Sequence, residues 1–155
     1  MDQYYNLAPN QIDIYMEQIL HGDSPLYNIG GYLKIKGVLQ QDLLEKAIQR
    51  IIKENNALRI MLSPGSPLPK QIIYQHIDFS LKTIDFSGEC NSTQCCINWL
   101  QKEFTKPFKL LENPLFSYVL LISSNEEYYI LHKYHHIIAD GWTTMLIVQQ
   151  MALFY

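Results

Sequence analysis

Two adjacent histidines, His135 and His136, are followed by Asp140 and Gly141, a set of residue types suited to proton transfer. A neutral imidazole changes its charge near neutral pH and can take a proton from an attacking amine or hydroxyl. A nearby carboxylate can hold a histidine tautomer or pair with a cation, and glycine lets the backbone turn tightly or approach a substrate closely. Neighbours on an extended chain point to opposite sides, so only one histidine is expected to face reactants.

These residues are predicted to lie at a corner between a strand and a helix. An apolar, aromatic run at residues 128–134 precedes them, and a helix-like run at residues 142–155 follows. Loops at such corners often present side chains to ligands.

A metal site is the first alternative to consider. His132 lies two residues before Tyr134, on the same face of the predicted strand, and joins His135, His136 and Asp140 as a possible zinc ligand. Adjacent histidines on an extended chain cannot easily reach one ion, so we expect no metal.

Three stretches, in order, resemble the motifs of one enzyme family. The run His-His-Ile-Ile-Ala-Asp-Gly-Trp at 135–142 resembles the His-His-x-x-x-Asp-Gly signature of condensation domains of nonribosomal peptide synthetases, a branch of the chloramphenicol-acetyltransferase-like acyltransferases. Residues 7–15 resemble the first motif of that family, Ser-x-Ala-Gln-x-Arg-Leu-Trp, and residues 55–62 resemble the motif His-Glu-x-Leu-Arg-Thr-x-Phe. Three motifs in the same order are a far more specific resemblance than one.

The resemblance implies a role for each site residue. His136 matches the second histidine of the signature, which implies that it is the catalytic residue, either as a general base or by positioning and charge stabilisation. His135 matches the first histidine, which supports the loop. Asp140 is implied to form a bracing ion pair, and Arg59 of the second matching motif is its expected partner. Gly141 is expected to be needed for the turn and to leave room for a phosphopantetheine arm.

Some positions depart from the family pattern. Asp13 replaces the arginine of the first motif and Tyr15 its tryptophan, while residues 55–56 are both asparagine where the second motif has histidine and glutamate. These changes remove cations that support the loop in the family, so Arg59 is expected to carry more of that support. Trp142 is expected to lie in the core.

The reaction implied by the resemblance is amide formation. An acyl or aminoacyl group on the phosphopantetheine thioester of an upstream carrier protein would pass to the amine held on the downstream carrier. No directly bound cofactor is expected, and the expected partners are carrier protein domains, a C-terminal lobe and adjacent synthetase domains. Three alternatives stay open: an epimerisation domain, another acyltransferase of the superfamily that uses coenzyme A or a free alcohol, and a noncatalytic lobe that docks carrier proteins.

Composition limits the class of protein. The chain has 155 residues, of which 48% are hydrophobic and 17% charged, as expected for one globular unit. The net charge of −3 argues against a nucleic-acid partner, and no apolar run suggests a membrane span. Residues 1–6 lack the features of a signal peptide, and Cys90, Cys95 and Cys96 are expected to be reduced and structural. We therefore expect a cytoplasmic protein.

Helical and strand patterns alternate along the chain and predict an α/β fold, a two-layer sandwich with a mixed, largely antiparallel sheet. Helices are predicted at 9–21, 41–55, 92–104 and 142–155, and strands at 28–36, 58–62, 70–77, 81–86, 115–122 and 127–134, the last two as a hairpin. The resemblance implies that residues 1–155 form the N-terminal lobe of a chloramphenicol-acetyltransferase-like domain. The C-terminal lobe would be absent, and little activity is expected from this lobe alone.

Overall fold

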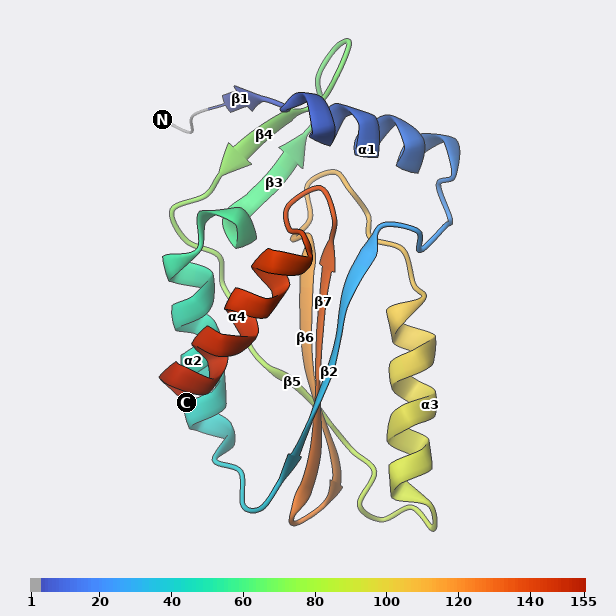
Figure 1. Cartoon of the computed structure of the whole chain (residues 1–155), viewed down its shortest axis with the longest axis vertical. Helices are drawn as coiled ribbons and strands as arrows, with labels where there is room; N and C mark the ends of the chain where they lie inside the picture. The colour runs from blue at the N-terminus through green and yellow to red at the C-terminus, as the bar shows by residue number, and fades with distance from the viewer. Residues whose placement is uncertain (1–3) are drawn as a thin grey trace.

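A computed structural model describes residues 4–155, which form four α-helices and two β-sheets (Figure 1). The helices are α1 (Pro9–Leu20), α2 (Gln41–Glu54), α3 (Ser92–Phe104) and α4 (Gly141–Phe154), with a 3₁₀ turn, η1, at Asn56–Arg59. The strands are β1 (Tyr4–Asn6), β2 (Asn28–Lys36), β3 (Ile60–Ser63), β4 (Lys70–Ile73), β5 (Lys82–Asp85), β6 (Phe116–Ser124) and β7 (Glu127–His135).

The larger sheet has the strand order β2-β7-β6-β5, and the smaller one β1-β4-β3. Strand β7 pairs antiparallel with β2 on one side and with β6 on the other, whereas β5 lies parallel to β6. All pairs of the smaller sheet are antiparallel. The prediction of an α/β fold with a mixed, largely antiparallel sheet is therefore confirmed, and so is the hairpin of β6 and β7.

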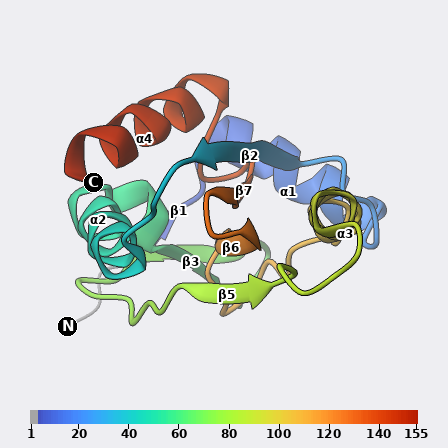
Figure 2. The ribbon, with the colours of Figure 1, turned by 90° about the horizontal axis from the view of Figure 1, so that it is seen from below.

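Helices cover both faces of the larger sheet (Figure 2). Helices α2 and α4 pack on one face, where Ile48, Ile51 and Ile147 join the main hydrophobic core. On the other face, α3 contributes Cys96 and Leu100 to a second apolar cluster. The alternating side chains of β6 and β7 point into these two cores, so both strands are buried along nearly their whole length.

The predicted helix boundaries agree with the structure to within one residue at each end. Two strand predictions need correction, because the chain at 56–59 forms a 3₁₀ turn before β3, and β4 ends at Ile73 and not at residue 77. Strand β1 has only three residues, all exposed, so it carries no alternating pattern that the sequence could reveal.

The three cysteines are free, as predicted, but they differ in burial. Cys96 is buried in the α3 cluster, where burial raises the pKa of its thiol to about 11. Cys90 is exposed, so a structural packing role for it is wrong. No helix within residues 4–155 is long and apolar enough to cross a bilayer.

Gly30 in β2 gives a test of the packing that supports the end of β7. Its φ is +121°, and a Cβ there would lie 2.1 Å from the carbonyl oxygen of His132 in β7. We expect Gly30→Ala to lower the free energy of unfolding by more than about 3 kcal/mol, because backbone strain and a clash with a fixed strand add. Urea unfolding measures this loss. Gly22→Ala is the matched control, since a Cβ at Gly22 meets nothing within 4 Å, and equal stability of the two variants would contradict the packing described.

Candidate active site

The two histidines lie where β7 ends and the chain turns toward α4. The end of β7 lies below α1 in Figure 1. The backbone N–H of His135 donates to the carbonyl of Leu115, and that of His136 donates to the carbonyl of Tyr27 at 2.8 Å. The N–H of Ile138 closes the turn on the carbonyl of His135. The side chain of His135 is 1% exposed, whereas that of His136 is exposed to solvent. The two rings therefore differ in environment as sharply as the alternation of an extended chain predicts.

The buried ring of His135 is bonded at both nitrogens. Its Nδ1 accepts the backbone N–H of Ile137 at 3.2 Å, and its Nε2 lies 3.3 Å from Oε1 of Gln18. Burial, with a smaller contribution from His136, lowers the pKa of His135 to about 4. A neutral ring with two partners suits a group that holds the turn and does not exchange protons.

Two residues that the sequence reasoning did not single out also hold this turn. Gln11 in α1 donates from Nε2 to the carbonyl of Ile137 at 3.0 Å, while its Oε1 accepts the N–H of Ala8. Tyr27 supplies the carbonyl that binds the N–H of His136. Gln11 occupies the glutamine position of the first matching motif, so the motif itself was the available sign of its role.

The expected ion pair between Asp140 and Arg59 does not form. Oδ1 of Asp140 accepts the backbone N–H and the hydroxyl of Thr143, both at 2.7 Å, so Asp140 is the N-cap of α4. These bonds from Thr143 are the main cause that lowers the pKa of Asp140. An N-cap satisfies free N–H groups at the start of a helix, and Asp140 meets that local need without a distant cation.

Arg59 braces a different part of the chain. Its guanidinium donates to the carbonyls of Tyr74 and Gln75, which follow β4, and to the side chain of Asn56. Its Nε is buried without a hydrogen-bond partner. Arg59 therefore ties η1 to the segment after β4 and does not support the histidine loop directly.

Gly141 and Trp142 also differ from expectation. Gly141 is the first residue of α4, and the glycines with positive φ in the described chain are Gly30 and Gly37, so the turn does not require glycine at 141. A Cβ at Gly141 would meet nothing within 4 Å, which leaves open space beside the histidine loop. Trp142 is 68% exposed, so its placement in the core is wrong.

Within residues 4–155, no three side chains of histidine, cysteine, aspartate or glutamate gather closely enough to hold a metal ion. His132 is buried, and its odd spacing from His135 places the two rings on opposite faces of β7. The Nδ1 of His132 has no hydrogen-bond partner, and burial lowers its pKa to about 4.

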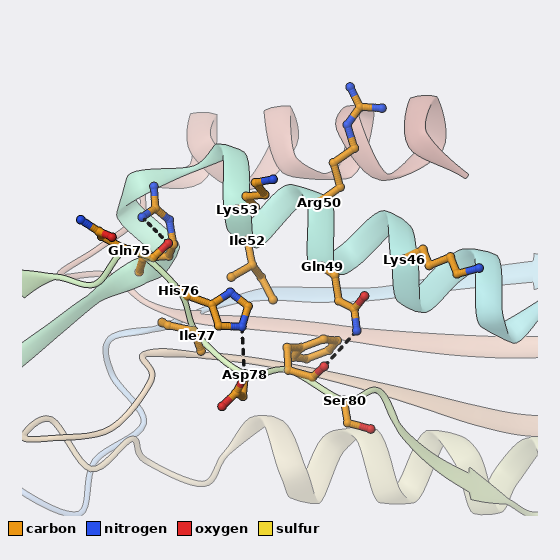
Figure 3. A pocket seen from close by; sticks show the side chains of 12 residues that line it. Lys46, Gln49, Arg50, Ile52, Lys53, Gln75, His76, Ile77, Asp78 and Ser80 are labelled. Atoms are coloured by element: carbon orange, nitrogen blue, oxygen red, sulfur yellow. Dashed lines mark hydrogen bonds and ion pairs between the residues drawn. The ribbon is translucent and has the colours of Figure 1, made fainter.

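A groove of about 720 Å³ lies elsewhere, between α2 and residues 75–80 (Figure 3). Its lining includes the cations Lys46, Arg50, Lys53 and Arg59, with none of the residues of the histidine loop. The side chain of Arg50 is already paired with Glu54, as is common on an exposed helix face.

The fold agrees with comparisons to known proteins. The family model described as Condensation domain matches residues 1–155, and the chain therefore belongs to the condensation-domain family. It is 32% identical over 154 residues to the dimodular nonribosomal peptide synthase of Bacillus subtilis (strain 168), covering 99% of this chain and 6% of that protein. It is 31% identical over 156 residues to bacitracin synthase 3 of Bacillus licheniformis, covering 99% of this chain and 2% of that one.

Solved structures show the same relation. The starter condensation domain of rhizomide synthetase RzmA superposes with a TM-score of 0.91 at 30% identity, over 99% of this chain and 39% of that chain. The first condensation domain of the calcium-dependent antibiotic synthetase superposes with a TM-score of 0.84 at 20% identity, over 97% of this chain and 36% of that chain, which supports the fold alone. This chain thus spans little more than a third of the solved condensation domains that it matches.

The capping role of Asp140 predicts an order of stabilities. Asp140→Ala is expected to lower the urea midpoint because the N–H of Thr143 loses its acceptor, whereas Asp140→Asn keeps a capping oxygen and stays near the wild type. The folded-state pKa of Asp140 is lowered below 3.8, so the loss in Asp140→Ala is full at neutral pH and shrinks as the pH falls below that value. An equally large loss in Asp140→Asn would restore the ion-pair interpretation.

The buried histidines predict a pH dependence of stability. His132 has a pKa near 6.5 when unfolded and about 4 when folded, so the unfolded chain binds more protons between these values. The stabilisation is full above pH 6.5 and is lost as the pH falls toward about 4. His132→Leu should give a shallower fall of the urea midpoint over this range. His76→Leu removes an exposed histidine by the same change of residue type and is the matched control. Identical slopes in all three proteins would contradict the burial of a neutral His132.

Proposed function

We propose that residues 1–155 are the N-terminal lobe of a nonribosomal peptide synthetase condensation domain, and that His136 is its catalytic residue. The observation that carries the proposal is the exposed ring of His136 on a turn whose backbone N–H groups are hydrogen-bonded, in a chain of the condensation-domain family. Domains of this family transfer acyl or peptidyl groups in peptide synthetases.

The exposed apolar surface of α4 is evidence for a second lobe. Trp142, Met145, Leu146 and Leu153 recur at helical spacing and are all exposed, while Ile147 and Met151 on the same helix are buried. A surface helix is normally polar on its outer side, and an exposed apolar stripe of this kind is typical of an interface. The second lobe of the domain is the occupant we propose for it.

The reaction joins two substrates that are both tethered. The acceptor amine attacks the carbonyl carbon of the donor thioester, a C–N bond forms, the C–S bond breaks, and the thiol of the phosphopantetheine leaves. One proton is lost from the amine nitrogen and one is gained by the thiolate. Because the thioester is already activated, the enzyme must mainly align the two reactants and accept one proton.

We propose that His136 accepts that proton. Its ring makes no hydrogen bond to another described side chain, so both nitrogens are free for reactants. We assign His136 the role of general base for the amine. The open space beside Gly141 leaves room for a substrate arm next to this ring.

The substrates and partners follow from the same proposal. The starter condensation domain of rhizomide synthetase RzmA, as a double mutant, has been solved in complex with C8-CoA and Leu-SNAC. For this chain we propose thioesters on the phosphopantetheine of carrier protein domains, with no cofactor bound directly, and the adjacent synthetase domains as partners. Location in the cytoplasm stays a prediction.

The test is amide formation between two loaded carrier proteins, followed by mass spectrometry, with this chain and a separately expressed second lobe. His136→Ala should lower the rate by about 10²- to 10⁴-fold, as expected for loss of a positioned base. The matched control is His76→Ala, because His76 is exposed and bonds only to Asp78 among the described side chains. Its rate should equal that of the wild type.

Two outcomes would contradict the proposal. Product formed at the wild-type rate by His136→Ala would remove His136 from the chemistry. No product in any mixture, although the lobes bind each other and the carriers, would favour a noncatalytic docking lobe.

A further inference from the structure

We infer that Gln18 of α1 is a positioning residue that sets the tautomer of His135 and, through it, the turn that presents His136. Gln18 is 5% exposed, and its side chain reaches from α1 to the ring of His135. The inference rests on the proposed function only for the role of His136. The chain of hydrogen bonds stands independently of that role.

The orientation of the Gln18 amide follows from its partners. Its Nε2 donates to the carbonyl oxygens of His21 at 3.2 Å and Ser24 at 3.1 Å, which uses both N–H bonds of the group. A flipped amide would set its oxygen against two carbonyl oxygens. The oxygen Oε1 must therefore face His135.

That orientation dictates the proton on His135. An amide oxygen can only accept, so the Nε2 of His135, 3.3 Å away, carries the hydrogen and donates it to Gln18. In the neutral ring, Nδ1 then has a free lone pair, and it accepts the N–H of Ile137 at 3.2 Å. Ile137 is the next residue after His136, so the tautomer and the turn are one hydrogen-bond system.

Gln18 holds the turn by a second route as well. The carbonyls that it binds belong to the connection between α1 and β2, which continues to Tyr27. The carbonyl of Tyr27 accepts the N–H of His136. The buried amide of Gln18 thus holds both the His135 ring and the connection that leads into β2. These two groups together support His136.

Among residues 4–155, no charged side chain bonds directly to the His135 ring. From β7, His136 is adjacent, and Lys133 lies over the ring of Phe108, which packs edge-on against His135 with ring centroids 6.1 Å apart. From the α1 side, the Tyr27 ring lies 6.0 Å from His135, and its hydroxyl is bonded to Glu17. A carboxylate in place of the Gln18 amide would set an anion directly against the buried ring.

Gln18→Glu tests the inference by replacing the Nε2 amide group with an oxygen. This oxygen loses both donor bonds and faces the carbonyls of His21 and Ser24, so Gln18→Glu is also expected to be less stable than the wild type. The carboxylate favours the doubly protonated ring, in which Nδ1 carries hydrogen and cannot accept from Ile137. Long-range ¹H–¹⁵N NMR of this chain reads the state of each assigned histidine ring. We expect His135 of the wild type to be protonated at Nε2 alone at neutral pH, and that of Gln18→Glu to be protonated at both nitrogens.

The control and a second variant keep the test decisive. Gln94→Glu makes the same change on the exposed side of α3 and should leave the His135 resonances unchanged. If Gln18→Glu does not fold, Gln18→Met removes donor and acceptor without adding charge. It should then give a mixture of His135 tautomers and about tenfold faster hydrogen exchange at Ile137. Wild-type ring resonances in the folded Gln18 variant, or hydrogen on Nδ1 in the wild type, would overturn the inference.

Kinetics separate positioning from general loss of structure. In the two-lobe assay, Gln18→Met should lower kcat about tenfold and leave KM for the carrier proteins unchanged, because Gln18 does not contact substrate. The rate of Gln18→Glu should recover toward the wild type at higher pH, as the His135 ring loses its extra proton. A tautomer change with unaltered kcat would refute the role assigned to the loop while leaving the tautomer assignment intact, and a KM change alone would contradict positioning.

Discussion

The turn that carries His136 depends on β7, which has a hydrogen-bonded neighbour on each side. Strand β7 is buried between β2 and β6, with helices over both faces of the sheet. Its backbone N–H and C=O groups therefore need hydrogen-bond partners within the protein. The chain can turn outward only where other groups take over this bonding. That happens at His135 and His136, whose N–H groups donate to the carbonyls of Leu115 and Tyr27, respectively.

The hydrogen bonds that hold the turn come from neutral polar groups and not from ions. Gln11, Gln18 and His135 bind the turn through amide and imidazole groups that lie against the apolar core. An ion pair at such a place would lose hydration, a cost that its Coulomb attraction often fails to recover. Amides meet the same backbone groups at a lower desolvation cost, which is why the loop holds without the expected pair of Arg59 and Asp140.

The same reasoning explains the departures from the family motifs. Asn55 stands where the second motif has histidine, and its side chain bonds to the carbonyl of Ile51 and to Gln150 of α4. Asn56 accepts a bond from Arg59. These asparagines connect α2, η1 and α4 directly, so the missing cations do not leave the region without bracing.

Helices and strands with a repeating pattern could be predicted from the sequence. Hydrogen bonds between residues far apart in the sequence could not. The 3.6-residue pattern of α2 and the alternation of β2 each lie within one segment, so their bounds were predictable. The role of Gln18 depends on His135, 117 residues away, and no local pattern signals such a contact. The pairing of Asp140 was wrong because the motif places an acid near the site without saying that Thr143, three residues on, would take its oxygen.

The side chains at the start of α4 complete this argument. Gly141 has no conformational reason to be glycine, and Trp142 has no packing reason to be tryptophan, within the residues that the structure describes. Both follow directly on the histidine turn, and the exposed apolar stripe of α4 continues from Trp142 to Leu153. An exposed residue that neither backbone conformation nor packing explains is instead explained by contact with a binding partner. Under the proposed function, the contact surface for a second lobe therefore begins at Trp142, a few residues along the chain from the turn that presents His136.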